Sequence, residues 1–175
     1  MIKKYSNQFF KTNAYDGLTE NNVNVIIYHI NMNPNSETPI KTKLIILVGV
    51  SGSTKSTFAE KYIKEHPNTI LLSSDAIRKA LTGDESDQKS TPQVFSILKY
   101  RLEQGLKIGK SVMVDATSLN PKERRDYIDA AKKYNAKSIA YVFERDKSTL
   151  MKNQATRKAS GGREVPEFVI DKMLA

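Results

Sequence analysis

The sequence predicts an α/β fold in which a parallel sheet of about four to five strands carries helices on both faces. From residue 41 onward, apolar strand-like runs alternate with segments of helical periodicity. Strands separated by helices of ten or more residues imply parallel pairing, because each crossover returns the chain to the same end of the sheet. The run at 44–48, LIILV, is apolar throughout, as a strand buried on both faces should be.

The same alternation predicts the remaining elements in order. Short apolar runs predict the strands of the sheet at residues 43–48, 69–73, 111–115 and 137–143. Helical spacing, first-turn prolines and capping residues predict helices at about 55–65, 75–81, 91–109, 120–134, 146–156 and 166–174. Residues 157–165 carry two glycines and two arginines and are expected to form a loop.

Residues 1–42 differ in composition from residues 43–175, which we expect to form the main domain. The first segment is rich in Asn, Thr and Ser and contains one alternating stretch at 23–30, which predicts a strand. Residues 31–39 contain two prolines and predict a linker. We therefore expect an N-terminal extension that adds a strand or docks elsewhere, and that could join the chain to a larger assembly.

The composition excludes several classes of protein. The 175 residues include no cysteine, which rules out disulfides and thiolate metal sites, and the two histidines are isolated. No apolar run approaches the ~20 residues of a membrane span, and the start of the chain lacks a signal-peptide pattern. We therefore expect a cytoplasmic protein with no membrane partner. The net charge of +9 favours polyanionic partners such as nucleic acid, but a lysine-rich solvated surface explains it equally well.

Residues 49–57 read GVSGSTKST and nearly match the phosphate-binding loop G-x-x-x-x-G-K-[ST]. The expected strand before this stretch and the helix after it supply the context that the motif requires. In such a loop, backbone N–H groups surround a phosphate, the lysine contacts the β- and γ-phosphates, and the serine hydroxyl binds Mg²⁺. The candidate nucleotide-binding residues are Gly49, Gly52, Ser53, Thr54, Lys55, Ser56 and Thr57.

Thr54 occupies the position of the second motif glycine. The backbone passes close to the phosphates there, so a β-branched side chain would project into the phosphate space or force the loop to shift. Two interpretations stay open. Either a small shift accommodates the side chain, or nucleotide affinity is badly reduced, and local physics slightly favours reduced affinity.

A second group of candidate residues follows the expected strand at 69–73. Asp75 should lie near the γ-phosphate, because ligands of open parallel sheets bind at the carboxyl ends of the strands. A carboxylate there can accept a proton from an attacking hydroxyl, and Arg78, one helical turn further on, can contact a phosphate. Spacing alone favours the plainer interpretation, in which Asp75 only caps the helix.

Other charged residues are also candidates. Asp115 ends an apolar strand, where a carboxylate can help to position Mg²⁺. Arg157 and Arg163 flank two glycines and could neutralise a transferring phosphoryl group from a lid, although a solvated basic loop would have the same sequence. The basic helix start at 120–125 suits nucleic-acid contact and a solvated face equally well.

Four segments of the chain, in this order, resemble the 5′-kinase domain of polynucleotide kinases, the RNA end-healing enzymes of phage and bacteria. The matching segments are LVGVSGSTKSTFAEKY, LLSSDAIRKAL, SVMVDATSLNPKERR and the stretch from Arg157 to Ile170. Their order and spacing are more specific than any single motif. The resemblance covers most of the chain beyond residue 42.

This resemblance implies a P-loop NTPase fold and in-line transfer of the γ-phosphoryl group of ATP to a 5′-hydroxyl end of RNA or DNA. It implies that Asp75 is the general base and that Arg78 contacts the acceptor phosphate. The catalytic residues would be Lys55, Asp75, Arg78 and Arg157. ATP and Mg²⁺ would be held by the loop, by lid arginines Arg157 and Arg163, and by metal ligands Ser56 and Asp115.

Some features depart from this family pattern. Thr54 replaces the loop glycine, Ser118 stands where asparagine is frequent, and the sequence stops at Ala175, where family domains usually continue. A second hypothesis is therefore a nucleotide-impaired kinase fold that serves as a binding or structural module in a larger assembly. A third is a P-loop kinase that acts on a small molecule.

Overall fold

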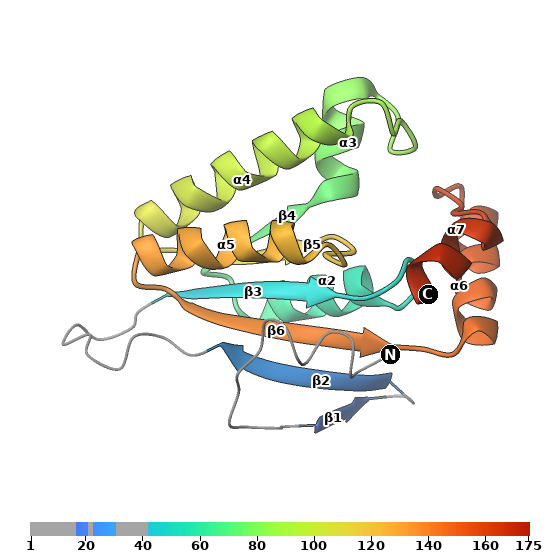
Figure 1. Ribbon diagram of the computed structural model, residues 1–175, viewed down its shortest axis with the longest axis horizontal. Helices are drawn as coiled ribbons and strands as arrows, with labels where there is room; N and C mark the ends of the chain where they lie inside the picture. The colour runs from blue at the N-terminus through green and yellow to red at the C-terminus, as the bar shows by residue number, and fades with distance from the viewer. Residues whose placement is uncertain (1–16, 21–22, 31–41) are drawn as a thin grey trace.

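The computed structural model describes residues 17–20, 23–30 and 42–175. Within them a six-stranded sheet has the order β1-β2-β6-β3-β5-β4, with helices on both of its faces (Figure 1). The strands are β1 (Gly17–Glu20), β2 (Val23–Ile30), β3 (Lys43–Val48), β4 (Thr69–Ser73), β5 (Ser111–Asp115) and β6 (Lys137–Glu144). The helices are α2 (Lys55–Glu65), α3 (Ser74–Thr82), α4 (Thr91–Lys107), α5 (Pro121–Lys133), α6 (Lys147–Ala159) and α7 (Glu167–Leu174).

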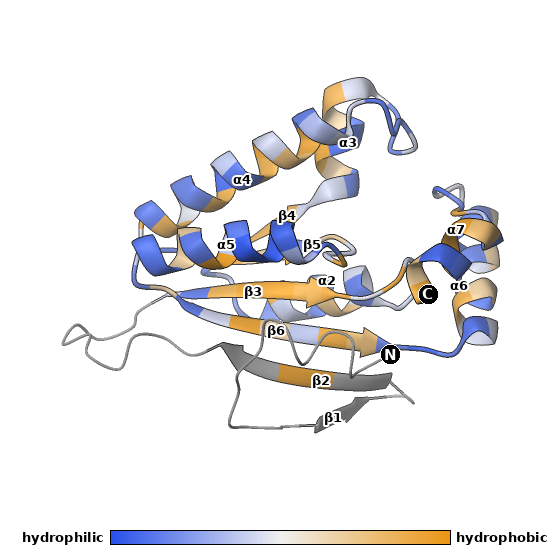
Figure 2. Cartoon of the chain, in the orientation of Figure 1, coloured by the Kyte–Doolittle hydropathy of each residue, from blue (hydrophilic) through white to orange (hydrophobic). Residues whose placement is uncertain are grey.

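The strands β6, β3, β5 and β4 are parallel, which confirms the predicted fold class. Strand β3 lies between β5 and β6, and its residues 44–48 have no exposed surface. Figure 2 shows this strand as almost uniformly hydrophobic. Because the four strands are parallel, their carboxyl ends meet at one edge of the sheet, toward which β3 and β6 point in Figure 1.

Two hydrophobic layers enclose the sheet, and β3 contributes alternate residues to each. Leu44 and Ile46 pack with the apolar stripe of α4, whose predicted members are all buried: Val94, Leu98, Leu102 and Leu106. Ile45 and Leu47 pack on the other face with Ala59 of α2. The helical spacing in the sequence therefore marked a true core face, and the two layers fix the strand ends that carry the site.

The predicted strand at 23–30 is confirmed as β2, and it pairs antiparallel with β6, with Ile26 opposite Val142. Strand β1 pairs antiparallel with β2 and was not predicted, because its sequence GLTE is too short to show an alternating pattern. The predicted linker at 31–39 lies outside the described residues. The strand of the extension thus joins the sheet of the main domain at its edge.

The helix boundaries differ from the prediction at one place that matters for the site. Helix α6 ends at Ala159, so Arg157 lies on its last turn and not in a loop as predicted. Arginine, lysine and alanine at 157–159 favour a helix, and positive charge is favourable at a helix C-terminus. In the described part of the chain, no helix is both long and apolar enough to span a bilayer.

Candidate active site

A pocket of about 990 Å³ opens at the carboxyl edge of the parallel strands. The loop at 51–54, the starts of α2 and α3, the end of β5, and parts of α6 and α7 contribute to its wall. Nearly all of the site residues predicted from the sequence line this one cavity: Gly52, Ser53, Thr54, Lys55, Ser56, Thr57, Asp75, Arg78, Asp115, Arg157 and Arg163. Gly49 is not in the wall but supports the loop from β3.

Glycine is required at both of the predicted loop positions. A Cβ on Gly49 would lie 2.8 Å from the carbonyl oxygen of Phe143, and the backbone N–H of Gly49 donates to Thr117. A Cβ on Gly52 would lie 2.9 Å from the carbonyl oxygen of Leu150, and the φ of Gly52 is +87°. The loop therefore packs tightly between the end of β6 and helix α6.

Two side chains of α6 hold this loop, and no sequence pattern predicted either of them. Nδ2 of Asn153 donates to the carbonyl oxygen of Gly52 at 2.7 Å. Nε2 of Gln154 donates to Oγ of Ser51 at 2.8 Å, and the Gln154 side chain is buried. Both residues are a hundred positions from the loop in sequence, so only the folded structure brings them to it.

Lys55 opens α2 and is buried inside the loop. Its Nζ donates to the carbonyl oxygen of Val50 at 2.9 Å and to Oγ of Ser53 at 3.2 Å. Burial lowers the pKa of Lys55 from its ordinary 10.5 to about 8, against the opposing charges of Asp115 and Asp75. Lys55 is thus held on neutral oxygen acceptors of the loop, with carboxylates nearby.

Thr54 adopts a left-handed backbone conformation, with φ 71° and ψ 17°, directly before α2. Glycine takes this conformation without strain, whereas a β-branched residue does not. The motif thus requires glycine at this position for its backbone conformation as well as for the close approach of phosphates. The Thr54 hydroxyl donates to the carbonyl oxygen of Ser53 and accepts from Nη2 of Arg145 at 3.2 Å. These two contacts hold the unusual residue in place.

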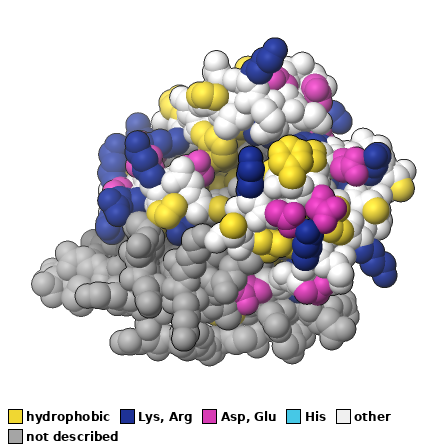
Figure 3. Space-filling model, turned by 45° about the vertical axis from the view of Figure 1, so that its right-hand side comes forward, with side chains coloured by type: hydrophobic (Ala, Val, Ile, Leu, Met, Phe, Trp, Pro, Cys, Tyr) yellow, Lys and Arg dark blue, Asp and Glu magenta, His cyan; other side chains and the backbone are white. Residues whose placement is uncertain are grey.

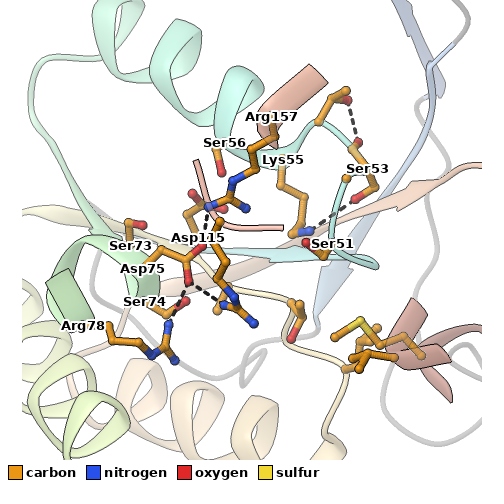
Figure 4. Close-up of a pocket in the computed structure, with 18 of the residues that line it drawn as sticks. Ser51, Ser53, Lys55, Ser56, Ser73, Ser74, Asp75, Arg78, Asp115 and Arg157 are labelled. Atoms are coloured by element: carbon orange, nitrogen blue, oxygen red, sulfur yellow. Dashed lines mark hydrogen bonds and ion pairs between the residues drawn. The ribbon is translucent and has the colours of Figure 1, made fainter. Parts of the chain in front are cut away.

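The interpretation of Asp75 as a helix cap is wrong. Ser73 is the N-cap of α3, and its Oγ accepts from the backbone N–H of Ala76. The Asp75 carboxylate instead accepts from Nη1 of Arg78 at 2.8 Å and from Nη2 of Arg157 at 3.0 Å (Figure 4). Nη1 of Arg163 donates to the same carboxylate at 3.2 Å. Three arginines from two distant parts of the chain therefore meet on one acidic group.

These three arginines are not freely solvated. The side chain of Arg78 is 4% exposed, and its Nε has no hydrogen-bond partner within the described residues. Arg157 also donates to Glu85 at 3.2 Å, and Arg163 is only 18% exposed. The interpretation of 157–163 as a solvated basic loop therefore does not describe its two arginines.

Asp115 and Ser56 form a second polar pair on the floor of the pocket. Burial raises the pKa of Asp115, and the hydrogen bond from Ser56 and the charge of Lys55 oppose that rise. A carboxylate beside a hydroxyl fits Mg²⁺, which takes few protein oxygens and keeps several waters or phosphate oxygens. No cluster of three or more His, Asp or Glu side chains suited to a metal is present among the described residues.

The basic start of α5 divides into structural and exposed residues. Arg124 is 1% exposed, and its Nη1 donates to the carbonyl oxygens of Ser118 at 2.7 Å and Leu119 at 2.9 Å. It thereby fixes the loop between β5 and α5. This structural role differs from both predicted roles, nucleic-acid contact and a solvated face. Ser118 is buried with φ 47°, a conformation that asparagine tolerates better than serine.

Apolar residues also line part of the pocket: Phe95 of α4, Leu119, and two residues of α7, Val169 and Met173. Around the pocket, the surface carries mixed charge: Figure 3 shows acidic and basic side chains interspersed over the face that bears α6 and α7. The net charge of +9 therefore does not form a continuous basic patch on that face.

Comparison with known proteins agrees with this geometry. A family model described as an AAA domain matches residues 44–175. An L-seryl-tRNA(Sec) kinase of Methanococcus maripaludis is 26% identical over 134 residues, which are 74% of this chain and 50% of that protein. The chain thus spans half the length of this curated relative.

Similar solved structures include kinases with different substrates. A chain of the Pnkp1/Rnl/Hen1 RNA repair complex superposes with a TM-score of 0.70 and 25% identity, over 81% of this chain and 45% of that one. A gluconokinase of Sinorhizobium meliloti has a TM-score of 0.54 and 20% identity, over 78% of this chain and 75% of that one, which is a likeness of fold alone. These comparisons, with the loop and sheet described above, show that the chain belongs to the AAA domain family and has the fold of a P-loop kinase.

Proposed function

We propose that the protein is an ATP-dependent polynucleotide 5′-hydroxyl kinase. The observation that carries this proposal is the position of Asp75: an acidic side chain lies in the same pocket as the phosphate loop and is surrounded by three arginines. A general base and a set of cations beside a phosphate loop are the groups that phosphoryl transfer to a hydroxyl requires.

On the donor side, the loop would take the ATP phosphates. The backbone N–H groups of 52–57 and the N-terminus of α2 supply positive ends of dipoles, and Lys55 would exchange Val50 and Ser53 for phosphate oxygens. Ser56 and Asp115 would hold Mg²⁺. When bound, this ion neutralises charge on the β- and γ-phosphates.

On the acceptor side, Asp75 would accept the proton of the 5′-hydroxyl as its oxygen bonds to the γ-phosphorus. The bond from the γ-phosphorus to the β–γ bridging oxygen breaks, and ADP leaves. Arg157 and Arg163, which contact Asp75 in this structure, would transfer their donors to the phosphate oxygens and stabilise their charge. This exchange would also remove two hydrogen bonds from the Asp75 carboxylate, which would then be available to accept the proton.

The acceptor would enter along the part of the pocket that Phe95 and Leu119 line. Arg78 is buried beside Asp75 in the pocket lining, where its guanidinium suits a phosphate of the terminal nucleotide. Phe95 and Leu119 offer a surface for the flat face of a nucleobase. A wall of this kind favours a nucleic-acid end over a small polar acceptor. The similarity to a chain from an RNA repair complex supports an RNA end as the substrate and a larger assembly as the setting.

The test is transfer of labelled γ-phosphate to a panel of acceptors. A 5′-hydroxyl RNA or DNA oligonucleotide should be labelled, and the same oligonucleotide with a 5′-phosphate should not. Acceptor binding should weaken with added salt, because phosphate contacts release counterions. Labelling of gluconate or another small acceptor, with no labelling of either oligonucleotide, would assign the site to a small-molecule kinase.

A second function is favoured by one observation, the left-handed backbone of Thr54. A branched residue in this conformation is strained, and its side chain lies in the pocket wall. If Thr54 blocks the phosphates, the fold would serve as a binding module without nucleotide in a larger assembly. This alternative predicts that Thr54→Gly restores nucleotide binding that the natural protein lacks.

A further inference from the structure

Glu85 lies in the short acidic loop between α3 and α4. One of its carboxylate oxygens, Oε1, accepts from Nη2 of Arg157 at 3.2 Å and from the backbone N–H of Arg163 at 2.5 Å. These partners lie 72 and 78 residues away in sequence. The carboxylate therefore joins the α3–α4 loop to the segment 157–163, named the lid below.

The shape of the lid explains how one oxygen reaches both donors. After α6 the chain turns back, and the N–H of Gly162 donates to the carbonyl oxygen of Arg157 at 2.9 Å. A Cβ on Gly162 would lie 2.8 Å from Cγ of Arg157, so the turn is closely packed on that side chain. This turn brings the guanidinium of Arg157 and the backbone of Arg163 to the same side of the lid.

The contacts of Glu85 differ from an ordinary surface ion pair in their burial and in their bond to the backbone. An exposed pair contributes little, because water replaces either partner. Glu85 and Arg157 are only 28% and 33% exposed. Their contact is accompanied by a charge-assisted hydrogen bond to the backbone, which fixes the chain path as well as a side chain. By contrast, Glu164, directly after the lid, pairs with Lys158, and both side chains are well exposed.

We propose that Glu85 is a positioning residue that holds the lid across the pocket, so that Arg157 and Arg163 face the phosphate end of the cavity. It touches no reacting atom and acts through the two arginines. Without it, the lid would keep its contacts to Asp75 but would lose its attachment to the α3–α4 loop. The effect that we expect on ATP kinetics rests on the proposed kinase function. The effect that we expect on the attachment of the lid does not.

Hydrogen exchange of the lid tests the structural consequence without any need for activity. In Glu85→Ala, the peptide covering residues 157–165 should exchange at least about fivefold faster than in the natural protein, because the Arg163 N–H loses its acceptor. In Glu164→Gln, which removes the charge of the carboxylate directly after the lid, exchange should stay unchanged. Equal exchange rates in Glu85→Ala and the natural protein would overturn the proposal. An unchanged melting temperature of both variants would establish that they fold.

Steady-state kinetics test the consequence for the site. Loss of a charged hydrogen bond predicts that Glu85→Ala raises KM for ATP by about tenfold. Glu85→Gln should give a smaller rise, because its amide oxygen still accepts from Arg163 but carries no charge for Arg157. Glu164→Gln should stay within about twofold of the natural protein. An unchanged or lowered KM in Glu85→Ala would contradict a positioning role. If the natural protein transfers no phosphate, the kinase proposal falls, and hydrogen exchange alone decides the role of Glu85.

Discussion

The phosphate loop and the arginine cluster around Asp75 share one pocket but are built in different ways. The loop is held by hydrogen bonds to uncharged acceptors, such as those from Asn153 and Lys55 to loop carbonyls. The cluster is held by charged pairs between side chains, with Asp75 contacting Arg78, Arg157 and Arg163. We therefore expect the loop to keep its conformation and the cluster to exchange partners if a phosphate binds.

Asp75→Asn should have the largest effect, because it removes the proposed base from the cluster and leaves the loop intact. Loss of a general base predicts a fall in kcat of about 10²- to 10⁴-fold, with little change in the Kd for ATP. Single-turnover transfer and equilibrium nucleotide binding separate these two quantities. Retention of full activity by this variant would remove Asp75 from the mechanism.

Gly52→Ala tests how rigid the loop is. The new Cβ would meet a backbone carbonyl at 2.9 Å in a left-handed conformation, so we expect a loss of about 2–3 kcal/mol in the free energy of unfolding. Gly109→Ala is a matched control, because its φ is +75° and nothing lies within 4 Å of the new atom. Urea denaturation should show a smaller loss for the control. Equal losses would mean that only the backbone conformation matters, and that the packing of the loop on α6 contributes nothing.

The pH dependence of ATP binding distinguishes the loop lysine from the cluster arginines. Burial holds the pKa of Lys55 at about 8, so the nucleotide-free protein loses this charge as the pH rises through 8. The Kd for ATP should therefore rise by up to about tenfold per pH unit above 8. Lys55→Arg, which stays charged, should show a flat profile wherever it binds ATP. A flat profile in the natural protein between pH 7 and 9.5 would show that Lys55 does not titrate in this range.

Thr54→Gly should have the smallest effect on stability. The substitution relieves the left-handed strain but removes two hydrogen bonds of the hydroxyl and adds freedom to the unfolded chain, so the net change should stay below about 1 kcal/mol. The Kd for ATP should fall by a few-fold, because the pocket wall opens. Thr54→Ser keeps the hydroxyl but not the methyl group, so its Kd for ATP should lie between those of the natural protein and the glycine variant. A rise in Kd for the glycine variant would mean that the contact with Arg145 supports the site.

The contrast between the two regions also explains what the sequence could predict. The loop follows from consecutive residues: a buried strand, glycines at fixed spacing, and a lysine that opens a helix. Its position between β3 and α2 was therefore predicted correctly. The left-handed backbone at Thr54 was not predicted, although a motif glycine often indicates such a conformation.

Apart from the pair Asp75 and Arg78, the cluster depends on contacts between residues 82 and 88 positions apart, which spacing cannot reveal. Resemblance to a family identified its charged members but not their mutual contacts, and it gave no indication of Glu85. The residues that support the site, Gln154 and Arg124, are polar side chains buried at helical positions. Local patterns assign such residues to a solvated surface, and only tertiary packing shows where they lie.

The central claim is that the loop holds ATP phosphates although Thr54 replaces glycine. The direct measurement is the melting temperature of the natural protein with and without millimolar Mg-ATP, beside Lys55→Ala. At a nucleotide concentration a hundred times the Kd, binding adds about 2.7 kcal/mol to the free energy of unfolding, which is a rise of several degrees. We predict this rise in the natural protein and its loss in Lys55→Ala. No rise in the natural protein, or an equal rise in both, would contradict the claim.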